Sequence, residues 1–124
     1  MSDEEDLIFR YTRADALADG VLVDVTATAR EAGIRHPTAV TQAVFERCVR
    51  VPEGVGGQDE AGRTWDVLWM LRLAVARSSG GELLLYTVLV RNDATGPRPV
   101  QLKALCHPGD DAKPVITILM PEED

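Results

Sequence analysis

The sequence predicts a single α+β domain, in which N-terminal short helices and one long buried helix pack on a C-terminal three-stranded antiparallel sheet. Three observations predict this class. Helical patterns fill the first part of the chain, strand patterns fill the last part, and short turn-rich segments join the strands. Helices followed by strands are the order of α+β folds, and consecutive strands with short links favour an antiparallel meander.

The N-terminal part predicts three short helices. Residues 12–20 have the spacing of a capping box and a glycine stop, and a second helix is expected over about 26–32. Residues 21–25 between them are β-branched, and fit either a short strand or an extended link. Pro37 suits the first turn of a third helix. The apolar residues of this third helix recur at intervals of three and four: Val40, Ala43, Val44 and Cys48.

The longest predicted helix runs from Thr64, as a plausible N-cap, to about Arg77. Residues 52–63 before it contain four glycines and a proline, and predict a long flexible connection. Apolar side chains surround most of the helix, and such helices are normally buried between other elements. We therefore expect residues 64–77 to form the central helix of the core.

Three strands are expected after Gly81, over residues 83–90, 100–106 and 115–120. The second alternates apolar and polar residues, as a half-buried strand does. Turn-forming residues occupy both connections. We expect one face of this sheet to pack on the helix 64–77. The N-terminal helices should cover the other face, because the first strand is apolar on both sides.

The size and charge of the chain limit the classes of function that it can have. The chain has 124 residues, which fits one domain over 1–124, and a net charge of −7. Four of the acids lie in residues 1–6 and three in 121–124, so thirteen acids balance thirteen bases between these segments. We expect solvated acidic tails at 1–6 and 121–124 on a neutral body. The pI of about 4.8 disfavours a general nucleic-acid binder.

The sequence predicts no catalytic group, no metal site and no cofactor. Adjacent residues on a strand point to opposite faces, so Cys106 and His107 should not pair. Asp110 and Asp111 lie near His107, but zinc needs three or four ligands in a closed geometry, and a solvated turn fits better. The glycine-rich residues 54–57 lack the context of a phosphate loop.

The candidate binding residues are mainly arginines. Arg10, Tyr11 and Arg13 form a compact basic and aromatic patch, and Arg30 and Arg35 flank the second helix. Guanidinium groups suit pairing with carboxylates or phosphates. The alternative is that the arginines near helix ends serve the helix dipole. The loop 52–63 is a second candidate surface.

Location follows from the termini and cysteines. The chain begins with acidic residues, where a secretory signal would begin basic, and no apolar run approaches the ~20 residues of a membrane helix. Cys48 and Cys106 each lie in an apolar stretch and fit reduced thiols. We expect a cytoplasmic protein without a membrane partner.

Several segments resemble a family of small uncharacterised bacterial proteins carried largely on plasmids, phages and other mobile elements. The similar segments are residues 11–26, 29–34, 36–41, 64–71 and 85–92, with the first the most distinctive. The resemblance implies a cytoplasmic accessory protein of a mobile element. Small proteins of that origin often bind host machinery, including restriction and CRISPR systems.

We therefore expect a non-enzymatic protein-binding accessory protein of a mobile element, with a host protein or protein complex as its partner. Its narrower form is an inhibitor of a host defence system, of the anti-CRISPR or anti-restriction type. The alternative is a nucleic-acid-associated regulator that uses the arginine patch. A third hypothesis is a small enzyme that uses His107 or Cys106.

Overall fold

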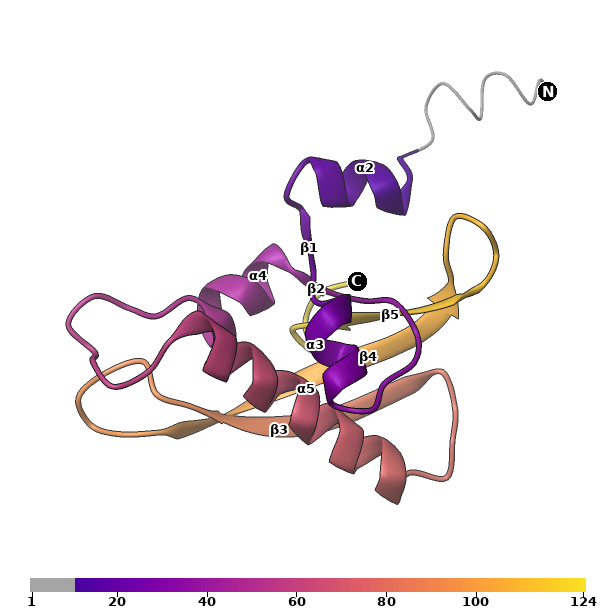
Figure 1. Cartoon of the computed structure of the whole chain (residues 1–124). Helices are drawn as coiled ribbons and strands as arrows, with labels where there is room; N and C mark the ends of the chain where they lie inside the picture. The colour runs from indigo at the N-terminus through magenta and orange to yellow at the C-terminus, as the bar shows by residue number, and fades with distance from the viewer. Residues whose placement is uncertain (1–10) are drawn as a thin grey trace.

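The computed structural model describes residues 11–124, so Arg10 and the acidic segment 1–6 lie outside the described residues. The elements follow one another in the order α2 (Arg13–Ala18), β1 (Leu22–Asp24), α3 (Thr26–Glu31), β2 (Thr38–Thr41), α4 (Gln42–Val44), the π-helical turn η1 (Phe45–Val49), α5 (Glu60–Arg77), β3 (Leu83–Val90), β4 (Arg98–Pro108) and β5 (Pro114–Leu119). Helices thus precede the long strands, as the α+β prediction requires (Figure 1).

The prediction of a three-stranded antiparallel sheet is wrong. The sheet has five strands in the order β1-β2-β5-β4-β3, and it is mixed, because β2 pairs parallel with β5. The expected antiparallel meander is present as β3, β4 and β5, and each strand covers most or all of its predicted range. Beyond β5 the sheet continues with β2, which the sequence pattern missed, and with β1, which it left open as a strand or a link.

Strand β2 occupies the segment where a helix was expected to begin at Pro37. The side chains of Thr38 and Val40 are buried, and the β-branched residues of this segment suit a strand. The N–H of Ile116 donates to the carbonyl of Pro37 at 2.8 Å, which starts the pairing with β5. The helix begins only after Thr41, whose side chain caps α4.

Residues 21–25, which fitted a strand or a link, contain the short strand β1. It pairs antiparallel with β2, and Val23 lies opposite Val40. Helix α2 precedes this strand and begins with the predicted capping box. The side chain of Thr12 accepts from the N–H of Asp15 at 3.0 Å, and the Asp15 carboxylate accepts from the N–H of Thr12 at 3.2 Å.

Helix α5 begins earlier than predicted and is not buried on all sides. Its N-cap is Asp59, whose carboxylate accepts from the N–H of Gly62 at 2.7 Å, so the last residues of the expected loop are helical. One side of the helix packs into the core. The side chain of Trp69 is 41% exposed and that of Val75 is 45% exposed.

The helices α3, α4 and α5 lie with the core on one face of the sheet (Figure 1). The opposite face, called here the open face, is not covered as predicted. Helix α2 contacts β1 at one end of it, but outward-facing leucines of β3 are exposed: Leu83, Leu85 and Leu89. The first strand of the meander is thus apolar on both sides, although only one of its sides packs into the core.

The C-terminal acidic segment contacts the sheet. The carboxylate of Glu123 accepts from the hydroxyl of Thr41 at 2.7 Å and from the N–H of Met120 at 2.7 Å. The ammonium of Lys103 donates to the carbonyls of Pro121 and Glu123. These bonds fix residues 121–124 beside the ends of β2 and β5.

Candidate functional site

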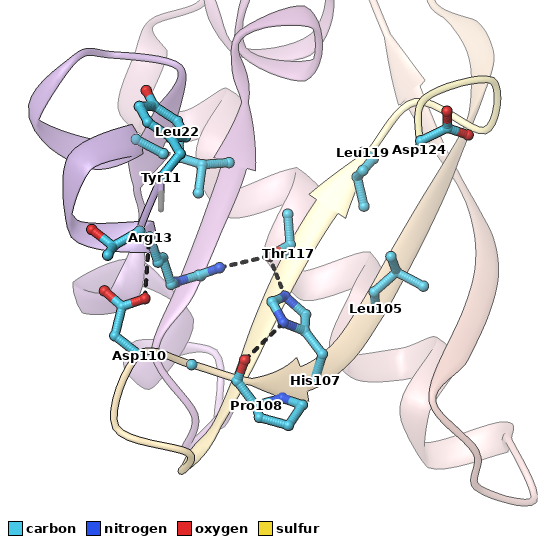
Figure 2. A pocket seen from close by; sticks show the side chains of 13 residues that line it. Tyr11, Arg13, Leu22, Leu105, His107, Pro108, Asp110, Thr117, Leu119 and Asp124 are labelled. Carbon is cyan, nitrogen blue, oxygen red and sulfur yellow. Dashed lines mark hydrogen bonds between the residues drawn. The ribbon is translucent and has the colours of Figure 1, made fainter. Parts of the chain in front are cut away.

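A hollow of ≈ 470 Å³ lies on the open face of the sheet, between α2 and strand β4 (Figure 2). We call it the open-face hollow. It is lined by residues of α2 and its cap, of β1, of β4 and the turn after it, of β5 and of the C-terminus: Tyr11, Thr12, Arg13, Ala16, Leu22, Leu105, His107, Pro108, Gly109, Asp110, Thr117, Leu119 and Asp124.

The alternation of side chains along β4 and β5 explains which residues form the floor of this hollow. Leu105 and Thr117 are direct partners in the β4–β5 register, and His107 and Leu119 lie two positions from them along their strands. Residues two apart on a strand share a face, so all four side chains point to the open face. The neighbouring Ile116 and Ile118 point into the core on the other side.

Arg13 is a tether between α2 and β5. One guanidinium nitrogen donates to the hydroxyl of Thr117 at 2.6 Å, and the other donates to the carbonyl of Ile116 at 2.9 Å. Partial burial lowers the pKa of Arg13, against the opposing charges of Asp110 and Asp24. The side chain is therefore a half-buried structural cation, and not the free surface charge that the sequence suggested.

Asp110 caps helix α2 from a distant part of the chain. Its carboxylate accepts from the N–H of Arg13 at 2.9 Å and from the N–H of Ala14 at 3.0 Å. These N–H groups belong to the first turn, which has no partners within its own helix. Asp110, which the sequence placed in a solvated turn, thus holds α2 against the hairpin of β4 and β5.

His107 and Thr117 complete a chain of hydrogen bonds that starts at Arg13 (Figure 2). The Nε2 atom of His107 lies 2.8 Å from Thr117 Oγ1, and its Nδ1 atom lies 3.1 Å from the carbonyl of Pro108. Because Thr117 Oγ1 accepts from Arg13, its own proton is available for His107 Nε2. A carbonyl oxygen can only accept, so His107 Nδ1 carries the proton of the bond to Pro108.

Tyr11 lies at the rim of the hollow. Its side chain is 57% exposed, and its hydroxyl donates to the carboxylate of Asp19 at 2.8 Å. This hydrogen bond raises the pKa of Tyr11. The phenol ring is thus held at the entrance by α2 while most of its surface faces solvent.

The structure brings two of the candidate binding residues together and separates two others from them. Tyr11 and Arg13 both line the open-face hollow. Arg30 and Arg35 are exposed beside α3, which packs against α5 on the helix-covered face. Arg10 lies outside the described residues. The four candidates that the structure describes therefore do not form one patch.

The cysteines differ in their surroundings. Cys48 is 1% exposed, and burial raises its pKa to about 11. Cys106 is half-buried and lines a cavity of ≈ 230 Å³, which His36 also lines. Sequence spacing gave no sign of this neighbourhood, because β4 and the loop before β2 meet only through β5. Over residues 11–124, no three His, Cys, Asp or Glu side chains are grouped to hold a metal ion.

A five-stranded mixed sheet with helices on one face and a hollow on the other defines a small α+β domain with an accessible sheet face. The chain belongs to the family of unknown function DUF6573, whose model matches residues 1–124. No curated protein matches the chain, and no solved structure matches it. Within the described residues, every helix is too short or too polar to cross a membrane.

Proposed function

We propose that the protein is a non-enzymatic, protein-binding accessory protein that receives its partner at the open-face hollow. The observation that carries this proposal is an accessible hollow whose floor is partly apolar, through Leu105 and Leu22, and whose rim holds the exposed ring of Tyr11. Protein interfaces combine an apolar centre with a polar rim, and tyrosine and arginine are enriched in them.

The geometry favours a protein over a nucleic acid as the partner. A nucleic-acid platform needs cations on one face, whereas Arg13 is tied to β5 and Arg30 and Arg35 lie on the other side of the sheet. His107 is engaged on both ring nitrogens by Thr117 and Pro108, so the hollow has no free base at this position. These contacts support binding rather than catalysis.

The narrower form of the proposal is a cytoplasmic accessory protein of a mobile element that inhibits a host defence system of the anti-CRISPR or anti-restriction type. Its support is the resemblance of residues 11–26 and of the later segments to proteins carried on plasmids and phages. The partner would then be a host protein or protein complex.

Capture from bacterial lysate tests the function. Tagged protein is incubated with nuclease-treated and untreated lysate, and bound material is identified by mass spectrometry. We expect a protein partner at fixed stoichiometry in both samples. Recovery in the untreated sample alone would contradict the proposal and support the nucleic-acid regulator, whose binding should also weaken steeply with salt.

A matched pair of lysine substitutions tests the surface. Leu105→Lys places a charge in the floor of the hollow, and Gln101→Lys places the same charge on the same face of β4, outside it. Loss of the captured partner with Leu105→Lys, but not with Gln101→Lys, is the expected result. Equal capture by both folded variants would show that the partner binds elsewhere.

A further inference from the structure

Strand β3 forms one edge of the sheet, and its outward backbone groups follow from its register. The N–H of Cys106 donates to the carbonyl of Glu82 at 2.8 Å, and hydrogen-bonded pairs alternate in an antiparallel ladder. The even-numbered residues of β3 therefore bond β4. The residues between them point N–H and C=O to the free edge: Leu83, Leu85, Thr87 and Leu89. The carbonyl of Arg91 already accepts from Gln58 and Arg63, so the free edge ends at Leu89.

Strand β3 itself carries none of the residues that usually protect an edge from pairing. Residues Leu83–Val90 contain no charge and no proline. The side chains of Leu83, Leu85 and Leu89 are 54%, 49% and 64% exposed. Natural edge strands are normally blunted by lysine, proline or a bulge, and a long apolar edge is a template for another strand.

We propose that β3 pairs antiparallel with β3 of a second copy of this chain, joining the two sheets across a two-fold axis at Tyr86. The free edge 83–89 is centred on Tyr86, so this register gives the largest overlap of unpaired backbone groups. It sets Leu83 opposite Leu89 of the second copy and Leu85 opposite Thr87. All four residues point their N–H and C=O outward, so donors meet acceptors along the shared edge.

Helix α5 carries a matching charge pattern above this edge. A groove of ≈ 430 Å³ between α5 and β3 is lined by Met70, Leu73, Ala74 and Arg77 of the helix. Asp66 lies on the same side of α5 four residues before Met70, and shares a small cavity with Leu89. The helical stripe is thus acidic at one end, apolar in the middle and basic at the other.

The charge pattern favours a second copy over an unrelated strand. A two-fold axis at Tyr86 runs the two α5 helices antiparallel, which brings Asp66 of each copy toward Arg77 of the other. Within residues 11–124, neither Asp66 nor Arg77 forms an ion pair. A surface with an acid at one end and a base at the other is self-complementary in an isologous contact.

Sedimentation velocity of the full chain over a wide concentration range tests the proposal. Wild-type protein should reach twice its mass of 13.5 kDa as concentration rises. Thr87→Pro removes an outward N–H without touching a bond to β4, and Asp66→Arg sets like charges together. Each should raise the dimer Kd about tenfold or more, because the two-fold axis repeats every contact. Glu53→Arg, on the loop before α5, is the matched control and should dimerise normally.

A charge swap makes the test specific to this register. Arg77→Asp should weaken the dimer as Asp66→Arg does, and the double variant should recover much of the wild-type affinity. Circular dichroism confirms that each variant is folded. A wild-type chain that stays monomeric overturns the proposal, and so does a double variant that dimerises no better than the single ones. Both results are independent of capture at the open-face hollow.

Discussion

Replacing Arg63 by methionine tests whether one buried guanidinium joins three segments of the chain. The side chain is 5% exposed. Its Nε donates to the carbonyl of Cys48 at 2.9 Å, and one terminal nitrogen donates to the carbonyl of Arg91 at 2.9 Å. The other donates to the side-chain oxygen of Asn92 at 2.7 Å and to the carbonyl of Arg47 at 3.3 Å. These bonds connect α5 to η1 and to the end of β3.

The expected loss of stability depends on which carbonyls keep another hydrogen bond after the substitution. The carbonyl of Arg91 keeps a bond from Gln58 at 2.8 Å, and the carbonyl of Arg47 keeps one from Asn92 at 2.9 Å. The carbonyl of buried Cys48 loses its bond from the guanidinium, and a buried unpaired acceptor costs about 1–3 kcal/mol. With the other charged hydrogen bonds lost as well, we expect the free energy of unfolding to fall by about 3–4 kcal/mol.

Urea unfolding monitored by tryptophan fluorescence and by circular dichroism measures this free energy. Arg72→Met is the matched control, because Arg72 is a half-buried arginine of the same helix, and its change should stay below about 1 kcal/mol. A fall of less than about 1 kcal/mol for Arg63→Met, or one equal to the control, would refute the reasoning that the guanidinium joins these segments.

Three further predictions concern α2, the thiols and the core. Asp110→Ala removes two hydrogen bonds to the first turn of α2. We expect the free energy of unfolding to fall by about 1 kcal/mol and amide hydrogen exchange to become faster throughout that helix. Unchanged exchange would contradict the capping role. Cys106 should react with a thiol reagent well before Cys48, because Cys48 is buried and burial raises its pKa to about 11. Peptide mass spectrometry shows which thiol is modified first. Earlier modification of Cys48 would be inconsistent with the fold. Tyr86→Phe removes a 3.0 Å bond to the carbonyl of Val67, and thermal unfolding should report a loss of about 1 kcal/mol rather than a gain.

The sequence predicted those elements whose stabilising contacts are local or adjacent. The capping box of Thr12 and Asp15 spans only four residues of the sequence, and the structure contains it. Strands β3, β4 and β5 are joined by short turns, so their pairing follows from alternation and connection length. Neither prediction depends on a segment that lies far away in the sequence.

Strand β2 could not be found in the same way. Val40 and Val44 fit a helical stripe, and Val44 does lie in a helix, but Thr38 and Val40 belong to a strand. The deciding interaction is the parallel pairing of Thr38 with Ile116, which is far along the chain. A four-residue strand carries too short a pattern to compete with an overlapping helical period.

The candidate site was predicted in part for a similar reason. Tyr11 and Arg13 were singled out because an aromatic beside arginines is a recurrent binding composition, and both line the hollow. The tether role of Arg13 depends on Thr117, whose position on the open face follows only from the β4–β5 register. Alternation along β4 separates Leu105 from the core residues of that strand, but its place in a hollow depends on the docking of α2 there.

The two proposed surfaces are geometrically compatible. Antiparallel pairing of β3 about a two-fold axis perpendicular to the sheet keeps the open face of both copies on the same side. The hollow lies on β4 and β5, away from the β3 edge, so dimerisation leaves it accessible. A joined sheet would therefore present two identical hollows in one direction. A partner with repeated or two-fold related sites would engage both, and would gain affinity from the second contact without any new interaction within either hollow.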